Sequence, residues 1–305
     1  MKKQFLLLSI LMIISGVAFS QKPEMLNKAD SLKYGWWDRT TQLGVNLSGS
    51  AFSQNWQGGG VNNMVLGGIF ANKADYTKGK GVWSNDIQLQ LGTITNYSKD
   101  NPKETRKNID RLFLETKYSR SINPKLNWFA SANFLSQFVK GYDYSDTKRP
   151  VISNLFAPAF LSEGIGLEWK PVKHFYLGLG GATIRQTIVS NKTVENSTYY
   201  AGQEKIYGVE RGKSVRLEGG FQLVAAYDKN ITDRVNLKWR WQTFTPYTLK
   251  TFDHNINAII TLKVNKYINV NGSLIGIYDW DQTGPKGLKP WQLNGGANLG
   301  FTLQL

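Results

Sequence analysis

The chain has 305 residues, no cysteine and a formal net charge of +15. The lack of cysteine excludes disulfides and thiolate metal sites, and the scattered Lys and Arg residues, with no basic helix, do not indicate a nucleic-acid partner. The hydrophobic fraction of 41% and the mean hydropathy of −0.35 fit a soluble secreted protein or a membrane barrel with a polar lumen. The content of 10 Trp, 14 Tyr and 15 Phe favours the barrel, because such barrels carry aromatic girdles at both membrane interfaces.

Residues 1–20 have the pattern of a cleavable signal peptide. Lysines at positions 2 and 3 precede an apolar run at 5–14, and small residues stand at positions 18 and 20, where signal peptidase reads the chain. The apolar run is shorter than the roughly 20 residues of a membrane-spanning helix, and no later segment is long enough. We therefore expect export, with residues 21–38 as a short periplasmic segment (a helix, a plug or a linker) before a barrel at 39–305.

Apolar and polar residues alternate with period two along most of the remaining chain. In the last segment Leu299, Phe301 and Leu303 share one face, and at 235–242 Trp239 and Trp241 alternate with charged residues. Glycines at 67–68 and 178–181 weaken the second and seventh segments, and we expect bends or bulges there. The pattern predicts an all-β fold, a transmembrane antiparallel β-barrel of about twelve strands, near 40–54, 61–74, 82–97, 108–121, 125–139, 163–170, 174–188, 213–228, 233–245, 254–264, 267–280 and 290–305.

The connections between these segments alternate in length. Short joints are expected at 123–125, 170–173, 228–233 and 265–266, and long polar ones at 140–162, 190–212, 246–253 and 279–289. Outer-membrane barrels have short periplasmic turns and longer extracellular loops, and an even number of strands places both termini in the periplasm. The alternative, a secreted β-sandwich, does not require such strict alternation.

The cost of placing charge in lipid decides which face points outward. A cation on the lipid face costs roughly 2–4 kcal/mol near the midplane. A one-residue slip of the strand at 235–242 would move both Lys238 and Arg240 into lipid, so this cost would apply to each of them. The polar rows should therefore face the lumen, with ion pairs between 216–218 and 238–240 on neighbouring strands. Bulky Phe113 and Phe129 should narrow the bore, and the cationic excess should favour anions. The predicted lumen-facing polar residues are Arg111, Glu115, Lys117, Glu168, Arg216, Glu218, Lys238, Arg240 and Lys263.

The first expected hairpin carries the motif Asn55-Trp56-Gln57-Gly58-Gly59-Gly60-Val61-Asn62. Consecutive glycines permit positive φ, and flanking Asn side chains cap turns, so the motif predicts a turn; contact with a ligand or partner is the alternative. The motif resembles the NWxxGGxN signature of a Bacteroidota outer-membrane family described only as domain of unknown function 3078, through Asn55, Trp56, Gly59, Gly60 and Asn62. The resemblance implies an outer-membrane barrel, but it does not imply any particular activity, because the family has none assigned.

We find no pattern that predicts catalysis, a metal site or a cofactor. The two histidines, His174 and His254, fall near opposite ends of strands without a nucleophile beside them, and Asp253 next to His254 should point to the opposite face. Residues 279–284 resemble the start of an EF-hand loop, but Pro290 stands where a bidentate Glu is needed.

The sequence therefore predicts a non-enzymatic outer-membrane barrel that forms a narrow or gated passage or binding module of the cell envelope. The alternatives are a structural or assembly barrel with an occluded lumen and, less favoured, a barrel hydrolase. The expected partners are outer-membrane lipid, lipopolysaccharide and an envelope protein that the sequence does not identify, with no nucleic acid.

Overall fold

The computed structural model describes residues 35–53, 61–97, 104–278 and 291–304, and in this part of the chain twelve strands close an antiparallel barrel. The expected fold class is confirmed. The barrel strands are β1 (Trp36–Ser50), β2 (Asn62–Lys78), β3 (Gly81–Tyr97), β4 (Glu104–Asn123), β5 (Leu126–Ser136), β8 (Ala159–Val172), β9 (Phe175–Ile188), β12 (Val215–Asn230), β13 (Val235–Pro246), β14 (Asp253–Lys263), β15 (Ile268–Tyr278) and β16 (Gln292–Gln304).

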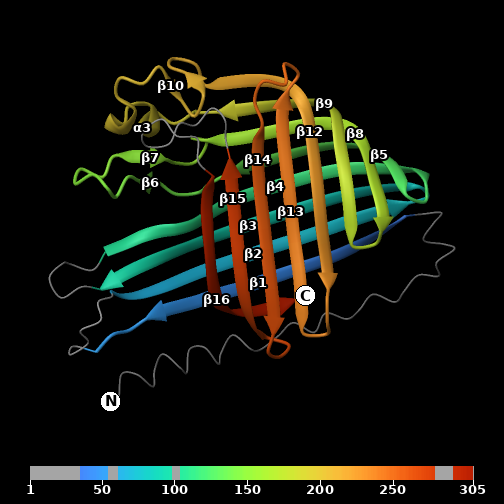
Figure 1. The fold of residues 1–305 in the computed structure, drawn as a ribbon, viewed down its shortest axis with the longest axis horizontal. Coiled ribbons are helices and arrows are strands. Elements are labelled where there is room, and N and C mark those ends of the chain that lie inside the picture. The colour runs from blue at the N-terminus through green and yellow to red at the C-terminus, as the bar shows by residue number, and fades with distance from the viewer. Residues whose placement is uncertain (1–34, 54–60, 98–103, 279–290, 305) are drawn as a thin grey trace.

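Each barrel strand pairs with the next one along the chain, and β1 closes the barrel against β16. In Figure 1 the strands of the near wall, β13 to β16, cross those of the far wall, β1 to β4, at a steep angle, as strand tilt in a closed barrel requires. β1 begins at Trp36, so residues 36–38 of the expected periplasmic segment belong to the barrel, and β8 is longer than the expected 163–170. The expected signal peptide and residues 21–34 lie outside the described residues.

The connections differ in length between the two ends of the barrel. At the short-turn end, where β1 begins and β16 ends, the strands are joined by residues 79–80, 124–125, 173–174, 231–234 and 264–267. Gly79 has a φ of +57°, which a tight turn accepts most readily from glycine. The long-loop end carries residues 137–158, 189–214 and 247–252. The predicted alternation of short and long joints is therefore confirmed for these connections.

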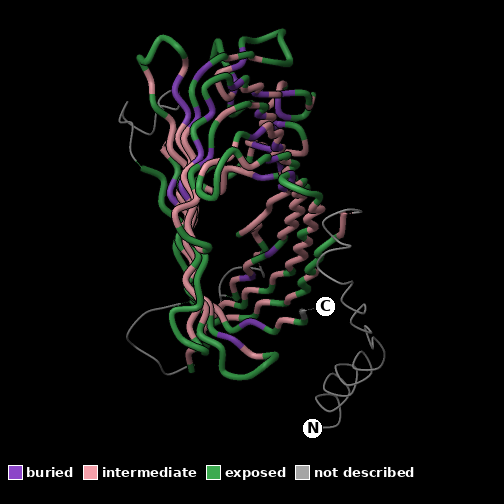
Figure 2. Tube along the Cα trace, turned by 90° about the vertical axis from the view of Figure 1, so that its right-hand side faces the viewer, coloured by how far each residue is buried: buried purple, intermediate pink, exposed green. Residues whose placement is uncertain are grey.

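The long connections at 137–158 and 189–214 fold against each other. They contain β6 (Gly141–Tyr142), β7 (Val151–Ser153), α3 (Lys192–Glu195), η2 (Thr198–Tyr200), β10 (Lys205–Ile206) and β11 (Val209–Glu210). No helix among the described residues is long and apolar enough to cross a membrane. Figure 2 shows buried segments gathered in its upper part, where Figure 1 places these elements. We call this substructure the loop cap.

The loop cap has a small core of its own. Its buried apolar side chains include Val194, Ile206 and Val209, and the hydroxyls of Tyr200 and Tyr207 both donate to the carbonyl oxygen of Ile152, at 2.7 and 2.8 Å. Burial raises the pKa of both phenols, so they remain protonated donors at neutral pH. Hydrogen bonds from one connection to the other thus hold the two loops together.

Glycine-rich segments behave differently in the two strands where we expected irregularity. Between β8 and β9 the register shifts at Ile165/Gly166, and between β9 and β12 it shifts at Gly220/Gln222. The expected bulge near 178–181 is therefore present. At Gly67-Gly68 both ladders of β2 continue without a shift, so the expected irregularity at this position is not a bulge.

Candidate functional site

The outer face of the barrel is apolar and exposed. Leu167, Leu179 and Leu293 are 50%, 52% and 69% exposed, because alternate side chains in a strand point to opposite faces. Aromatic residues surround the short-turn end, with Trp37 against Tyr76 at 5.2 Å and Tyr227 stacked on Trp239 at 6.1 Å. We call this set the aromatic girdle: Trp37, Tyr76, Trp83, Tyr118, Trp128, Trp169, Phe175, Tyr227 and Trp239.

A charged cluster lies inside the barrel at the level of this girdle. Its residues are sequence neighbours of girdle residues: Lys117 precedes Tyr118, Glu168 precedes Trp169, Tyr176 follows Phe175 and Arg240 follows Trp239. Because neighbouring side chains alternate between faces, each outward aromatic ring brings a charged or polar group into the lumen. We call the inner set the lumen charge cluster: Glu115, Lys117, Glu168, Lys170, Tyr176 and Arg240.

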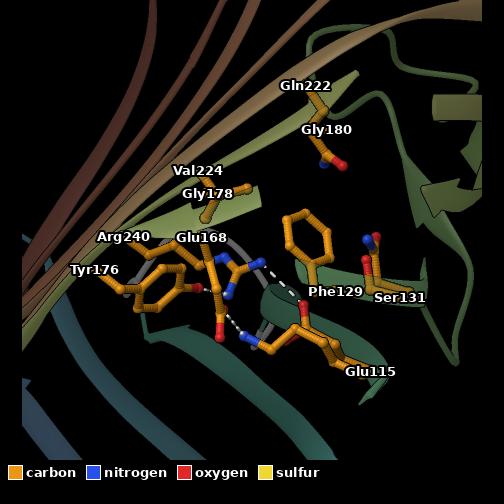
Figure 3. A pocket seen from close by; sticks show the side chains of 12 residues that line it. Glu115, Phe129, Ser131, Glu168, Tyr176, Gly178, Gly180, Gln222, Val224 and Arg240 are labelled. Carbon is orange, nitrogen blue, oxygen red and sulfur yellow. Dashed lines mark hydrogen bonds and ion pairs between the residues drawn. The ribbon is translucent and has the colours of Figure 1, made fainter. Parts of the chain in front are cut away.

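One ion pair of this cluster joins opposite walls. The guanidinium of Arg240 on β13 donates to a carboxylate oxygen of Glu115 on β4 at 2.9 Å, and to the hydroxyl oxygen of Tyr176 at 3.0 Å (Figure 3). In the barrel order of the described strands, β4 and β13 are separated by four strands on one side and six on the other. The pair therefore crosses the lumen.

The second part of the cluster is centred on Glu168, whose side chain is 1% exposed. Its carboxylate pairs with Lys117 at 2.9 Å and Lys170 at 2.5 Å, and accepts a hydrogen bond from Asn127 at 2.9 Å. The ammonium of Lys117 also lies 4.8 Å from the ring centre of Tyr176, which links this part of the cluster to Arg240.

Little space remains between these side chains. The cavity they enclose measures about 30 Å³, enough for only a few water molecules. Phe129 projects into it (Figure 3), with Ser131, Asn133, Gln222 and Val224 completing its wall. The predicted inward residues Phe113 and Phe129 are both buried.

A separate charged group lies toward the long-loop end. Arg185 pairs with Glu218 at 2.9 Å and Asp253 at 2.5 Å, and Arg216 pairs with Glu218 at 2.6 Å. The guanidinium of Arg185 lies 4.0 Å from the ring centre of Phe244. Arg185 and Asp253 were not among the residues predicted to face the lumen.

The predicted ion pairs between 216–218 and 238–240 are wrong. The register of β12 and β13 sets Ala226 opposite Arg240 and Gly220 opposite Pro246, so residues 216–218 lie beyond the end of β13. Lys238 instead pairs with Asp228 at 3.8 Å, with both side chains 56% exposed.

The remaining predicted residues are distributed as follows. Arg111 lies on β4, six positions before Lys117, and its guanidinium is 5.0 Å from the ring centre of Phe113. Lys263 is exposed at the short-turn end. In the glycine-rich motif, Asn62 accepts a hydrogen bond from the backbone N–H of Phe52 at 2.5 Å, whereas Asn55, Trp56, Gly59 and Gly60 lie outside the described residues.

The two histidines contact aromatic rings, and one of them also contacts a hydroxyl group. His254 contacts the hydroxyl of Thr243 at 2.8 Å and stacks on Trp291, and His174 packs edge-on against Tyr227. In the described part of the chain, no three His, Cys, Asp or Glu side chains are placed to share a metal ion. The EF-hand-like segment at 279–284 is not described.

Comparison with known families matches residues 47–142 to the model described as "Protein of unknown function (DUF3078)". The expected match to a family of unknown function is confirmed for this part of the chain, whereas the Bacteroidota origin and the NWxxGGxN signature stay predictions. No curated protein matches the sequence.

Several solved barrels resemble the chain in outline. A NanC porin is 10% identical over 87% of this chain and 97% of its own, with a TM-score of 0.35. A TodX monoaromatic hydrocarbon channel mutant is 10% identical over 88% and 83%, with a TM-score of 0.34. The translocator domain of the autotransporter NalP from Neisseria meningitidis is 10% identical over 90% and 91%, with a TM-score of 0.30. The barrel assignment itself rests on the strand pairing of this chain.

Proposed function

We propose that the chain is an outer-membrane protein of the Bacteroidota type that its glycine-rich motif resembles. The support is the division of its two faces: exposed leucines and an aromatic girdle outside, and a charged, hydrogen-bonded interior. Lipid provides an apolar environment for the outer face, and strand pairing around the closed barrel supplies a hydrogen-bond partner for each backbone N–H and C=O group that lies in the membrane. The short-turn end then faces the periplasm. The net charge, +15 for the full sequence and +13 once the two lysines of the expected signal peptide are removed, favours contact with anionic lipopolysaccharide.

The location predicts that a charge on the outer face is costly in a bilayer. Leu179 on β9 lies opposite Leu167 and Leu223, and Leu179→Lys should reduce the stability of the folded barrel in phospholipid vesicles by about 2 kcal/mol. The measurement is urea unfolding followed by tryptophan fluorescence. Lys263→Leu, at the exposed short-turn end, is the control and should change stability little; equal stability of Leu179→Lys and the unchanged protein would argue against lipid at this face.

We propose further that the barrel is a narrow passage gated by the Glu115–Arg240 pair. The observation that carries the proposal is that this pair spans the lumen between side chains of opposite walls. Buried ion pairs are often no more stabilising than apolar side chains of the same volume, so packing alone does not call for charges here. A side-chain ion pair can break and re-form without disturbing the strand ladder, which suits a gate.

Planar-bilayer recording tests the gate. We expect the unchanged protein to show small or intermittent currents, and Glu115→Gln and Arg240→Gln each to raise the open probability about tenfold, the factor for losing one charge-assisted bond of roughly 1.4 kcal/mol or more. Lys263→Gln removes a positive charge away from the pair and should leave the currents unchanged.

The opposite results would point elsewhere. Large, stable, nonselective currents from the unchanged protein would refute a narrow lumen. Silence in both variants, persisting after removal of residues 21–35 and shortening of the loop cap, would favour the structural or assembly role instead.

A further inference from the structure

The ladder between β1 and β16, which closes the barrel, is the shortest in the barrel among the described residues. β1 pairs with β2 along its whole length, Trp36–Ser50, and β16 pairs with β15 at 292–301, but β1 and β16 pair with each other only at 42–47 and 299–304. Every other barrel ladder is longer. In Figure 1 the two strands diverge from this paired part, β1 toward the left and β16 toward the top. The sheet is therefore interrupted between them on the long-loop side.

The two edges of this interruption are polar backbone with little side-chain cover. In the part of the chain that the structure describes, residues 48–50 and 293–298 have a neighbouring strand on one side only. An edge strand presents N–H and C=O groups, and each such group left without a partner in hydrocarbon costs several kcal/mol. A Cβ built on Gly296 would meet no described atom within 4 Å. Lipid tails alone are therefore a poor neighbour for these edges.

The barrel wall around the interruption carries no charged side chain, in contrast to the lumen charge cluster. The segments without an acidic or basic residue are 42–50, 61–72, 268–278 and 291–304. Neutral polar groups line their inner side instead. The amide of Asn271 donates to Asn298 at 3.3 Å, and that of Asn269 donates to the hydroxyl of Thr302 at 2.9 Å. This wall therefore favours uncharged polar groups that both donate and accept hydrogen bonds.

Apolar side chains lie beside these amides on the same inner face. Leu274 and Leu293 are 46% and 69% exposed on the outer face of β15 and β16, so alternation points Ile275 and Asn294, which are opposite each other in the ladder, into the lumen. Ile277 follows on the same face as Ile275. The inner wall next to the interruption thus combines neutral polar and hydrocarbon groups.

We propose that the interruption between β1 and β16 is a lateral entry site for an amphiphile with an uncharged, hydroxylated head and a hydrocarbon tail. The hydroxyl groups of the head pair with the strand edges and the inner amides, and the tail lies along Ile275 and Ile277. A charged head finds no counter-charge in this wall and loses its hydration. The inference rests on the proposed outer-membrane location, which brings lipid to the edge, and does not require that the barrel conducts.

Calorimetric titration of the full chain, held in an amphipathic polymer, with 1-octanoylglycerol tests the site. We expect saturable binding, about tenfold weaker or more for octanoate, which has the same tail and a charged head, and no binding of glycerol, which lacks the tail. Gly296→Phe fills the free space on the inner side and should weaken binding of 1-octanoylglycerol by about tenfold or more. Ala297→Phe, at the next residue, adds the same ring on the outer face and should bind as the unchanged protein does.

The possible results separate the entry site from the other proposals, once circular dichroism shows that both variants fold. Heat that never saturates, or equal affinity in Gly296→Phe and the unchanged protein, would overturn the entry site. Octanoate bound as tightly as 1-octanoylglycerol would overturn the uncharged head. Binding that Gly296→Phe abolishes, in a barrel that never conducts, would support the entry site and remove the gated passage. Unchanged stability of Leu179→Lys in vesicles would count against the membrane location, whatever the titration shows.

Discussion

Replacing Glu168 with glutamine is expected to lower the free energy of unfolding by roughly 3–5 kcal/mol, the range for removing one partner of a buried ion pair. The Glu168 side chain is 1% exposed and neutralises both Lys117 and Lys170. Glutamine keeps the shape of the side chain and one hydrogen-bond acceptor, but it removes the carboxylate that pairs with the ammonium of Lys117, itself 16% exposed. Urea unfolding in phospholipid vesicles, followed by tryptophan fluorescence, measures the loss.

Two further variants show whether the loss comes from the buried charge. Glu210→Gln removes a carboxylate from the exposed Glu210–Lys213 pair of the loop cap and should leave stability unchanged. Lys117→Met in the Glu168→Gln background removes the stranded cation and should recover part of the loss. A Glu168→Gln barrel as stable as the unchanged protein would show that Glu168 does not hold this wall together.

The strands were predictable because lipid imposes a simple requirement on them. Outward positions in the membrane core are mostly apolar or aromatic, so residues such as Leu299 and Phe301 can be assigned to the outer face from their period-two spacing alone. The short turns could be placed for a related reason, since Pro, Asn and Gly interrupt the alternation there. The outcome is a set of strand positions that agree with the structure to within a few residues.

The partners of the inner charges were not predictable in the same way. The residues Glu115 and Arg240 are 125 positions apart in sequence, and they meet only because the tilt and stagger of the closed barrel set β4 across from β13. Strand alternation predicts that both residues face inward, but the shear of the closed barrel cannot be predicted from the sequence of either strand. The expected contact between 216–218 and 238–240 failed for a different reason, because it assumed a register that the β12–β13 hairpin does not have.

Arg185 was missed because of a bulge. Tyr176, Gly178 and Gly180 line the inner cavity, so unbroken alternation along β9 would point Arg185 outward. The register shift between β8 and β9 inserts one residue on β9 after Gly180. Alternation is reversed beyond it, which leaves Ile184 exposed and brings Arg185 to Glu218. The glycines at 178–181 were the only sequence signal for this reversal.

The bulge between β8 and β9 predicts a second large loss of stability, on replacement of Gly166 by alanine. A Cβ built on Gly166 would lie 2.0 Å from the carbonyl oxygen of Leu179 and 2.8 Å from Cα of Gly180, so Gly166→Ala should separate β8 from β9 at this point. We expect a loss of about 3 kcal/mol or more in the free energy of unfolding, the upper end of the cost of overpacking, because the obstacle is backbone and cannot rotate away. Urea unfolding in vesicles measures it.

Gly68→Ala on β2 is the matched control for Gly166→Ala. A Cβ at Gly68 meets no atom within 4 Å, and the ladders on both sides of it continue without a shift, so this variant should match or slightly exceed the stability of the unchanged protein. Because Arg185 faces inward only beyond the bulge, Gly166→Ala should also weaken the contribution of the Arg185–Glu218 pair. Glu218→Gln should then cost less stability in the Gly166→Ala background than alone. Equal costs in the two backgrounds would show that the close approach at Gly166 does not determine where Arg185 points.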